Sequence, residues 1–500
     1  MHREEIGNRG AKTFAEAKTL SRGIAARFPL LLLCVVCGAQ LMVALDLSIV
    51  NVALPAIRRG LGFSPHDLQW VVSAYSLAFG GFLLLAGRAG DVFGRRSCLL
   101  LGALLFALAS LLGGLAVSPG WLIGTRFMQG VGAAFLSPNA LALLTTTFEE
   151  GPARSKAFGM VGAVMSSGVV LGNVAGGLLT AGPGWRWVLL INVPLLLVIS
   201  VLALLVLPVL PTSPLQRRTR RLDVPGALLI TLSLMLLVAV LSEGNILGWF
   251  SAGTAGLVLL ACLLLMAFVV VESRVRDPLI RLALLRRRSL AAANLITVLA
   301  PGTYGALLFL LTLYLQEVLH FSALSTGVAL IPLELALALT INLVPRLLAR
   351  GGIKPVLVGA ALAMIVGLLL MLRIRSQEDY PGTVLPALLT VGLGIGALFN
   401  ATAVAATAGV PDEEQGSAVG LMSTSQQMGN GLLLALTTTI AQVVTTHRQA
   451  QGTAPVEAVV AGFQAALLAA AGVMVLVLII ALVVNWSAEG DHASPRRGKP

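Results

Sequence analysis

The chain's first apolar stretch reads Leu30-Leu-Leu-Leu-Cys-Val-Val-Cys-Gly-Ala-Gln-Leu-Met-Val-Ala-Leu-Asp-Leu-Ser-Ile-Val-Asn-Val-Ala-Leu54. As an α-helix it would rise roughly 37 Å, which is more than the ~30 Å hydrocarbon core of a bilayer. Similar stretches, each about 20 residues long, recur about every 30 residues along the chain. The sequence therefore predicts an all-α integral membrane protein.

The composition of the chain excludes a soluble globular fold. Of its 500 residues, 57% are hydrophobic and 11% are charged, whereas soluble domains carry about 25% charged residues. The mean hydropathy is +0.92. Strands of a membrane β-barrel would alternate apolar and polar residues, and the apolar stretches show no such alternation. Lipid must therefore be the solvent for most of the protein surface.

Fourteen membrane spans are expected. They cover residues 30–54, 69–87, 98–117, 121–146, 157–180, 187–209, 224–243, 252–272, 290–315, 324–345, 354–372, 384–408, 417–444 and 459–485. The loop 87–96 is weakly repeated at 345–354, with Arg88, Gly94 and Arg96 matching Arg346, Gly352 and Lys354. Paired bundles around a shared cavity are common in transporters. We therefore expect the major facilitator fold: six-helix bundles at 30–209 and 290–485, an inserted transmembrane hairpin with basic linkers at 210–289, and tails at 1–29 and 486–500.

The positive charges indicate the orientation of the chain. With both termini in the cytoplasm, 27 of the 34 Lys and Arg residues fall on the cytoplasmic side, six lie in outer loops, and Arg126 lies inside a span. Lys and Arg concentrate in cytoplasmic loops of membrane proteins. The net charge of +12 is therefore attributed to orientation in the cell membrane rather than to a nucleic-acid-binding face.

Several classes of function are not expected. No loop is long enough to fold as a soluble catalytic domain, and no G-x-x-x-x-G-K-[ST] phosphate loop occurs, so neither enzyme activity nor ATP hydrolysis is expected. The four cysteines lie in apolar spans, where Cys34 and Cys37 are interpreted as small hydrophobic residues. The five histidines fall in loops or tails. We expect no metal site, no cofactor and no obligate protein partner.

Three ionisable side chains lie inside predicted spans and are candidates for proton coupling: Asp46, Arg126 and Glu334. Ionisable groups are costly in hydrocarbon and usually mark functional sites. From the helical rise, Asp46 and Arg126 lie roughly 6 and 10 Å outward of the middle of their spans, so they could share a depth. Asp46 either exchanges protons during transport under the influence of Arg126, or forms a structural ion pair with it. Glu334 either releases a proton when a cationic ligand or water arrives, or stays protonated and bonded across helices.

Small and polar residues inside the spans form a second group of candidates. Gly168, Gly172 and Gly176 recur every four residues, with Gly177 adjoining. Such spacing lets helices approach closely, and it serves either static packing or a sliding contact. Polar side chains in mid-span need partners in hydrocarbon, and a set of them is expected to line a cavity: Gln40, Asn51, Gln129, Asn139 and Asn400.

Four motifs together resemble one family. They are Leu45-Asp-Leu-Ser-Ile-Val-Asn-Val-Ala-Leu-Pro55, Gly87-Arg-Ala-Gly-Asp-Val-Phe-Gly-Arg-Arg96, Arg126-Phe-Met-Gln-Gly-Val-Gly132 and Gly184-Trp-Arg-Trp-Val-Leu-Leu-Ile-Asn-Val-Pro194. The chain resembles the major facilitator superfamily and, within it, the fourteen-span drug:proton antiporters of the EmrB/QacA type. The resemblance implies alternating access and export of amphipathic or cationic compounds in exchange for protons.

The resemblance also implies roles for individual residues. Asp46 and Arg126 would act in coupling. The loop between the second and third spans would act as a cytoplasmic latch between helices, formed by Gly87, Arg88, Gly90, Asp91, Gly94, Arg95 and Arg96. The fifth span would carry the antiporter motif, although Asn173 follows Gly172 where the family usually has proline. The second copy of the loop has Ala349 in place of the aspartate, which predicts an asymmetric latch.

Two other functions remain open at this stage. The same scaffold could import a small solute or let it diffuse, and the departure at Asn173 weakens the prediction of export. A membrane sensor that transports nothing would need a soluble output domain, and the sequence shows none. Proton-coupled export of a drug, antibiotic or metabolite is the favoured prediction.

Overall fold

The structure is a computed structural model that describes residues 29–65, 67–148, 151–207, 222–248, 251–275, 278–279, 287–375, 380–408, 410 and 412–486. Within these residues, fourteen helical segments are long and apolar enough to cross a membrane. The predicted all-α membrane fold with about fourteen spans is therefore confirmed. The predicted tails, except Pro29 and Trp486, and most of the basic linkers at 210–221 and 276–286 lie outside the described residues.

The helices follow the predicted spans closely. The first set is α2 (Pro29–Leu61), α3 (Trp70–Phe93), α4 (Arg95–Gly114), α5 (Pro119–Thr147), α6 (Pro152–Ala181), α7 (Arg186–Leu190) and α8 (Asn192–Val206). The hairpin is α10 (Val224–Leu247) and α11 (Ala252–Arg274). The last set is α12 (Arg288–Leu313), α13 (Ala323–Ala329), α14 (Ile331–Gly351), α15 (Ile353–Met371), α16 (Leu385–Thr407), α17 (Asp412–Ala450) and α18 (Pro455–Val483), with short helices η1 (Asp67–Gln69), η3 (Tyr314–Val318) and η4 (Tyr380–Val384).

Local sequence explains where several helices begin. The side chains of Ser118, Asp223 and Ser251 accept hydrogen bonds from the backbone N–H groups of the first turns of α5, α10 and α11. Such caps satisfy donors that have no partner inside the helix. Prolines follow two of these caps at the first or second helical position, where their missing N–H group is not needed.

Two predicted spans are interrupted, and each interruption has a proline close behind it. The predicted span 187–209 divides into α7 and α8 at Ile191, and the span 324–345 divides into α13 and α14 at Leu330. Pro194 and Pro332 lie within three residues of these points. A proline has no N–H group for the residue four positions earlier, so each helix loses a backbone bond at the break.

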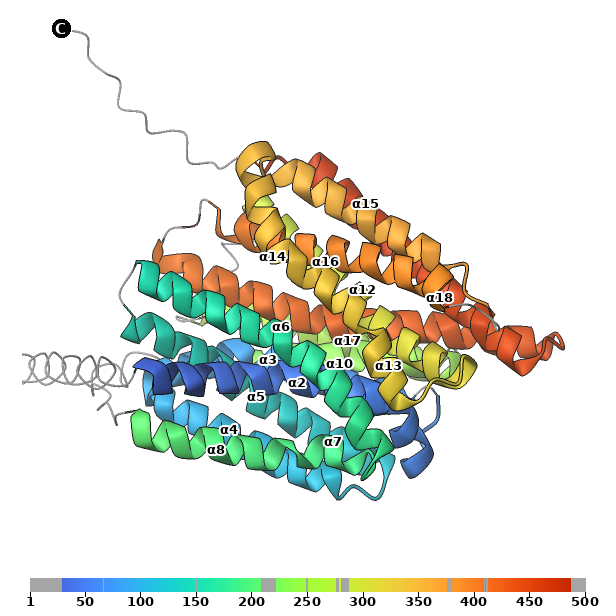
Figure 1. Ribbon diagram of the computed structural model, residues 1–500, viewed down its shortest axis with the longest axis horizontal. Coiled ribbons are helices and arrows are strands. Elements are labelled where there is room, and N and C mark those ends of the chain that lie inside the picture. Colours follow the sequence, from blue (N-terminus) through green and yellow to red (C-terminus); the bar gives the residue numbers. More distant parts are fainter. Residues whose placement is uncertain are drawn as a thin grey trace, which may run out of the picture.

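The helices form two groups with a hairpin beside them (Figure 1). Helices α2 to α8 pack mainly on one another, and so do α12 to α18. Helix α10 contacts both α3 and α17, and α11 packs on α10. One large apolar cluster of buried residues lies within the group α2 to α8, and a larger one runs through α12 to α18 and also includes buried residues of α2, α3, α5 and α7. The division of the chain into two bundles and an inserted hairpin is compatible with these contacts and stays a proposal.

The predicted repeat has a counterpart in backbone geometry. Gly94 separates α3 from α4, and Gly352 separates α14 from α15, with no further loop residue at either place. Both have positive φ angles, 95° and 75°, and both N–H groups bond to the carbonyl four residues earlier. Glycine adopts positive φ without steric strain. We call this end of the molecule the Gly94 end, and the opposite end, where α2 ends, the Arg58 end.

Candidate functional site

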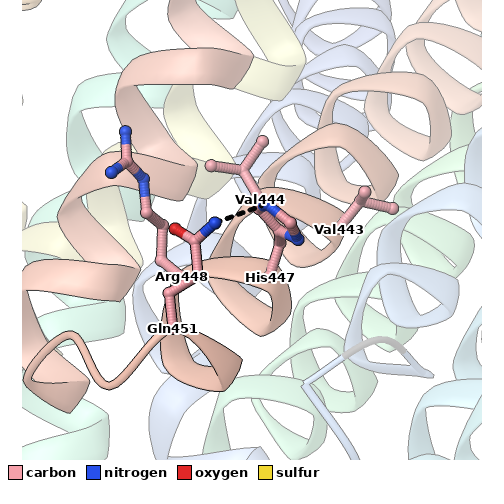
Figure 2. Close-up of a pocket in the computed structure, with 5 residues that line it drawn as sticks. All are labelled: Val443, Val444, His447, Arg448 and Gln451. Atoms are coloured by element: carbon pink, nitrogen blue, oxygen red, sulfur yellow. Dashed lines mark hydrogen bonds between the residues drawn. The ribbon is translucent and has the colours of Figure 1, made fainter.

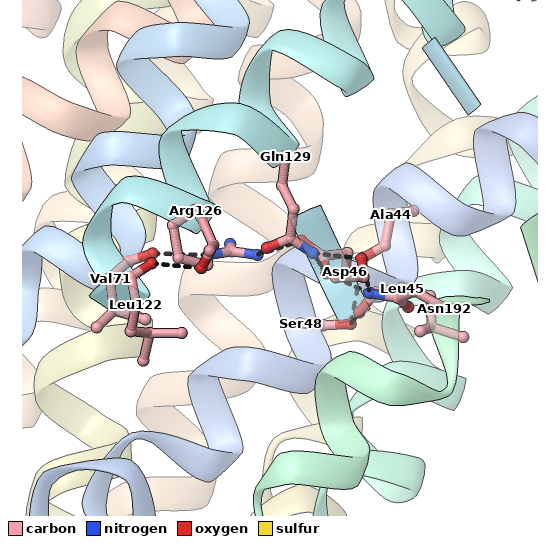
Figure 3. Close-up of polar contacts among 11 residues, drawn as sticks. Ala44, Leu45, Asp46, Ser48, Val71, Leu122, Arg126, Gln129 and Asn192 are labelled. Carbon is pink, nitrogen blue, oxygen red and sulfur yellow. Dashed lines mark hydrogen bonds and ion pairs between the residues drawn. The ribbon is translucent and has the colours of Figure 1, made fainter. Parts of the chain in front are cut away.

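The site is built around a buried ion pair between α2 and α5. Arg126 Nη1 lies 2.6 Å from Asp46 Oδ2, and the two side chains are 1% and 0% exposed. A buried charge is tolerated only when a partner and hydrogen bonds replace its hydration. The structure therefore brings together the two residues whose depths the sequence analysis matched (Figure 3).

Three further groups hold the Arg126 guanidinium. Its Nε donates to the carbonyl oxygen of Val71, at 2.9 Å, and its Nη1 also donates to Gln129 Oε1, at 2.9 Å. The ring of Tyr75 lies 4.4 Å from the guanidinium carbon, a cation–π distance. Helix α3 thus supplies a carbonyl and an aromatic face, and the arginine connects three helices.

The Asp46 carboxylate has a second donor that the sequence analysis missed. Asn192 Nδ2 donates to Asp46 Oδ1 at 2.8 Å. Gln129 Nε2 donates to Ser110 Oγ at 2.6 Å and lies 3.5 Å from Asp46 Oδ1. Asn192 is the first residue of α8, directly after the break at Ile191. Asn192 belongs to the motif at 184–194, which the sequence analysis singled out. The motif alone did not indicate that Asn192 contacts Asp46.

This arrangement can support proton exchange. With Asp46 charged, the ion pair is neutral and both carboxylate oxygens accept hydrogen bonds, whereas Tyr75 Oη and Asn192 Oδ1 have no hydrogen-bond partner among the described residues. With Asp46 protonated, the positive charge of Arg126 would lose its counter-ion in a site that excludes water, which is unfavourable. Protonation of Asp46 would therefore favour a rearrangement of the helices around Arg126 or entry of water.

Glu334 lies apart from this cluster, in the first turn of α14. It is 5% exposed, and Tyr304 Oη on α12 donates to its Oε1 at 2.5 Å. The Tyr304 ring packs edge-on against Phe399 of α16, with centroids 6.4 Å apart. Among the residues that the structure describes, no Lys, Arg or His forms an ion pair with Glu334.

The glycines of α6 face two different neighbours. Gly168, Gly172 and Gly176 lie against α2, and a Cβ added to Gly176 would come within 2.7 Å of the Ile49 carbonyl oxygen. Gly177 instead lies against α13, where an added Cβ would be 2.5 Å from Leu324 Cα. The backbone of Asn173 also touches Gly327 of α13. Helix α6 therefore joins the two groups of helices at closely packed backbone contacts.

The residues of the predicted latch lie at the Gly94 end. Arg95 pairs with Asp91 at 2.9 Å, Arg96 donates to the Leu204 carbonyl of α8, and Arg88 donates to the Pro278 carbonyl, which follows the hairpin. Gly87 and Gly90 face Pro138 and Asn139 of α5, leaving no room for side chains at Gly90. The loop thus holds α3, α5, α8 and the segment after α11 together in this conformation.

The amides predicted to line a cavity mostly lie between helices. Gln40 bonds to Ser137 of α5, Asn139 donates to the Ala86 carbonyl, and Gln129 belongs to the ion-pair cluster. These three are 1% exposed or less and do not face water here. Asn51 and Asn400 are partly exposed, and Asn400 donates to the Gly396 carbonyl of its own helix.

One pocket lies elsewhere, at the Arg58 end of α17. It has a volume of about 430 Å³ and is lined by Val443, Val444, His447, Arg448 and Gln451 (Figure 2). All five residues belong to the last two turns of one helix and the residue after it. A hollow beside a single helix end does not enclose a ligand, and we do not assign it to the site.

The two groups of helices are also joined by side chains at the Arg58 end. Arg58 Nη1 contacts both carboxylate oxygens of Glu317, at 2.8 and 2.9 Å. Beside it, Gln316 Nε2 donates to the Val52 carbonyl at 2.8 Å. Glu317 and Gln316 lie in η3, a π-helical turn at the end of α12, and such turns are frequent at functional sites.

Comparisons of the sequence with a family profile and with known proteins agree on one family. The profile described as Major Facilitator Superfamily matches residues 36–434. The puromycin resistance protein pur8 of Streptomyces alboniger is 42% identical over 463 residues, covering 90% of each chain. The cephamycin export protein CmcT of Amycolatopsis lactamdurans is 38% identical over 81% of this chain and 83% of its own. The lincomycin resistance protein of Streptomyces lincolnensis is 35% identical over 79% and 81%.

Solved structures support the fold. A crystal structure of the peptide transporter POT in complex with sulfate superposes with a TM-score of 0.65, covering 90% of this chain and 94% of its own. A crystal structure of the nucleoside transporter NupG, as the D323A mutant, has a TM-score of 0.61 and covers 90% and 99%. Both are 15% identical to this chain, so they bear on the fold alone.

Proposed function

The chain belongs to the Major Facilitator Superfamily, and we propose that it exports small antibiotic-like compounds across the cell membrane in exchange for protons. Its relatives are named for resistance to puromycin and lincomycin and for export of cephamycin. Export of a compound of this kind by alternating access is therefore the function that the family and the site support best.

The observation that carries the coupling is the buried pair of Asp46 and Arg126. The pair lies where three helices of one group meet, and Asn192 adds a fourth element to it. Protonation of Asp46 would remove the counter-ion of Arg126 and so favour a different packing of these helices. We propose that Asp46 carries the proton and that Arg126 keeps Asp46 in its charged form between proton transfers. We also propose that Glu334 is a second protonatable group.

The distribution of Lys and Arg supports a Gly94 end that faces the cytoplasm, with both termini on that side. In that orientation the outer side is closed by two sets of contacts: the Arg58–Glu317 ion pair, and the close backbone contacts of Asn173 and Gly177 in α6 with Gly327 and Leu324 in α13, which we call the α6–α13 seam. The loop 87–96 would then be the cytoplasmic latch, rearranging when the protein opens outward. This conformation would be the one that releases protons to the cytoplasm and receives the compound to be exported.

The test is gradient-driven uptake into inverted membrane vesicles that are acidified inside. Ethidium, rhodamine 6G and puromycin would be compared for the parent protein, Asp46→Asn and a control, Glu457→Gln, which alters an exposed carboxylate in the first turn of α18. We expect uptake that collapses with the pH gradient, is lost in Asp46→Asn and is retained in the control. Uptake that survives in Asp46→Asn would refute the coupling role. A correctly folded parent that moves none of the three compounds would count against export of this class.

A further inference from the structure

We infer that the inserted hairpin helps to hold the Arg58 end closed, through buried hydrogen bonds that join α10 and η1 to α17. We call the contacts of Gln69, Ser242, Thr438 and Thr439 the Gln69 clasp. The clasp would break when this end opens and form again when it closes. The inference goes beyond the proposed function and rests on it only for alternating access and for the assignment of the Arg58 end to the outer side.

The first argument is the environment of the Gln69 side chain. Gln69 is the last residue of η1, directly before α3, and it is 1% exposed. Its Nε2 donates to Ser242 Oγ of α10 at 2.5 Å, and its Oε1 accepts a hydrogen bond from Thr438 Oγ1 of α17. A buried amide that loses either partner is left with an unmatched polar atom, which is costly. One side chain thus joins the first group of helices to the hairpin and to the last group.

The second argument is a run of three threonines in α17 whose hydroxyl groups have different partners. Thr437 donates to carbonyl groups of its own helix. Thr438 does the same and also reaches Gln69. Thr439 instead donates to the Leu241 carbonyl of α10, at 2.7 Å. Two consecutive residues of α17 therefore bond to the first group and to the hairpin at nearly the same depth.

The third argument is how α10 is attached to its two neighbours, α3 and α17 (Figure 1). Towards the Gly94 end, Leu85 of α3, Ala227 of α10 and Leu279 form an apolar cluster that includes no α17 residue among those described. Nearer the Arg58 end, the apolar cluster around α10 includes both Leu77 of α3 and Ala435 of α17. If α3 and α17 separate at the Arg58 end, the hairpin should therefore stay with α3 and leave α17.

A static packing role is the competing explanation, since buried amides and hydroxyl groups need partners in any folded protein. The two explanations differ in what the bonds stabilise. A packing role predicts that loss of a hydroxyl group lowers the melting temperature and leaves the ratio of open to closed molecules unchanged. A clasp predicts that this ratio rises, because its bonds exist only in the closed conformation.

The experiment measures distances between pairs of nitroxide spin labels by pulsed electron paramagnetic resonance. It uses the full-length protein with its native cysteines replaced, without substrate or gradient. The labels are attached at Pro65 before η1, Leu247 of α10 and Thr446 of α17, all of which are exposed. The Pro65–Thr446 pair reports opening of the Arg58 end, and the two pairs with Leu247 report which side the hairpin follows.

The three threonines provide matched variants, because the same substitution removes a hydroxyl group with a different partner each time. Thr438→Val and Thr439→Val should each raise the ratio of open to closed molecules about fivefold, as expected for one lost hydrogen bond. Thr437→Val is the control and should leave the ratio unchanged. Gln69→Leu should act at least as strongly as Thr438→Val. Adding Thr438→Val to Gln69→Leu should change little more, since the hydroxyl group has then already lost its partner.

Two results would overturn the inference. One is a ratio in Thr438→Val and Thr439→Val that equals the ratio in Thr437→Val. The other is a Pro65–Leu247 distance that lengthens together with the Pro65–Thr446 distance, since the hairpin would then follow α17. Thermal melting of every variant identifies any change that is caused by unfolding. Because no transport is measured, a parent protein that exports none of the tested antibiotics would count against the proposed function and would not affect this test.

Discussion

The ion pair between Arg58 and Glu317 allows a quantitative test of the closed Arg58 end. It joins α2 to η3, and its side chains are 30% and 28% exposed. Exposed ion pairs contribute about 0–1 kcal/mol, and the contact of one guanidinium nitrogen with both carboxylate oxygens favours the upper part of that range. Because 1.4 kcal/mol is a tenfold change, losing about 1 kcal/mol should raise the ratio of open to closed molecules about fivefold.

The assay is the distance distribution between two nitroxide spin labels across the seam, measured by pulsed electron paramagnetic resonance. Ala181 of α6 and Ser325 of α13 are both exposed and lie on opposite sides of it. The four native cysteines, all free in the structure, would first be replaced. We expect Glu317→Gln and Arg58→Gln each to enlarge the longer-distance population, with little further change when the two are combined.

The charge reversal Arg58→Glu with Glu317→Arg is the decisive control. It restores an attractive pair at the same place, so the closed population should recover most of the way to the parent value. High salt should reduce the difference between parent and single variants, since exposed charges are screened within about 8 Å at physiological ionic strength. Single variants that leave the distribution unchanged would show that backbone packing between α6 and α13 holds this end closed without the ion pair. A reversal that recovers nothing would show that attraction between the two charges is not what closes it.

Three further predictions concern the ion-pair cluster and the glycines of α6. Removing the charge in Asp46→Asn leaves Arg126 buried without its counter-ion and should lower the free energy of unfolding by up to about 3–5 kcal/mol, measured by thermal melting in detergent; an unchanged melting temperature would mean that the arginine finds another partner. Asn192→Ala removes the donor to Asp46 Oδ1 and should lower the free energy of unfolding by about 1–3 kcal/mol, by the same measurement. It should also reduce uptake more than Asn400→Ala does, because the Asn400 amide bonds only within α16 and to Thr340. Gly176→Val forces α6 away from Ile49 of α2 and should lower the free energy of unfolding by about 1–3 kcal/mol or more. Gly162→Val, at a position with open space, should be tolerated. Equal effects of the two substitutions would contradict the close packing of α6 against α2.

The sequence predicted the membrane spans well because apolar length is a local property. It also predicted the shared depth of Asp46 and Arg126, since the helical rise converts residue position into depth. The breaks at Ile191 and Leu330 were missed, although Pro194 and Pro332 were visible, because membrane helices often tolerate proline without breaking.

Partners across helices were beyond the reach of the sequence. Asn192 is 146 residues from Asp46, and Tyr304 is 30 residues from Glu334; their contacts depend on the rotation of each helix about its axis, which apolar length does not reveal. Because the sequence does not reveal how each helix is rotated, Gln40 and Asn139 were expected at a cavity. Their amides find partners on neighbouring helices, and nothing in the sequence distinguishes a buried partner from water.

The hairpin of α10 and α11 also bears on how such a chain could arise. Each membrane crossing reverses the direction of the chain, so one added helix would invert the membrane topology of all the helices after it. A pair restores the original direction, and α12 starts at the same Gly94 end at which α8 finished. The matched turns at Gly94 and Gly352 therefore keep the same polarity, with both at one face of the bilayer. Lineages could gain or lose the pair as a unit without inverting the helices that follow it.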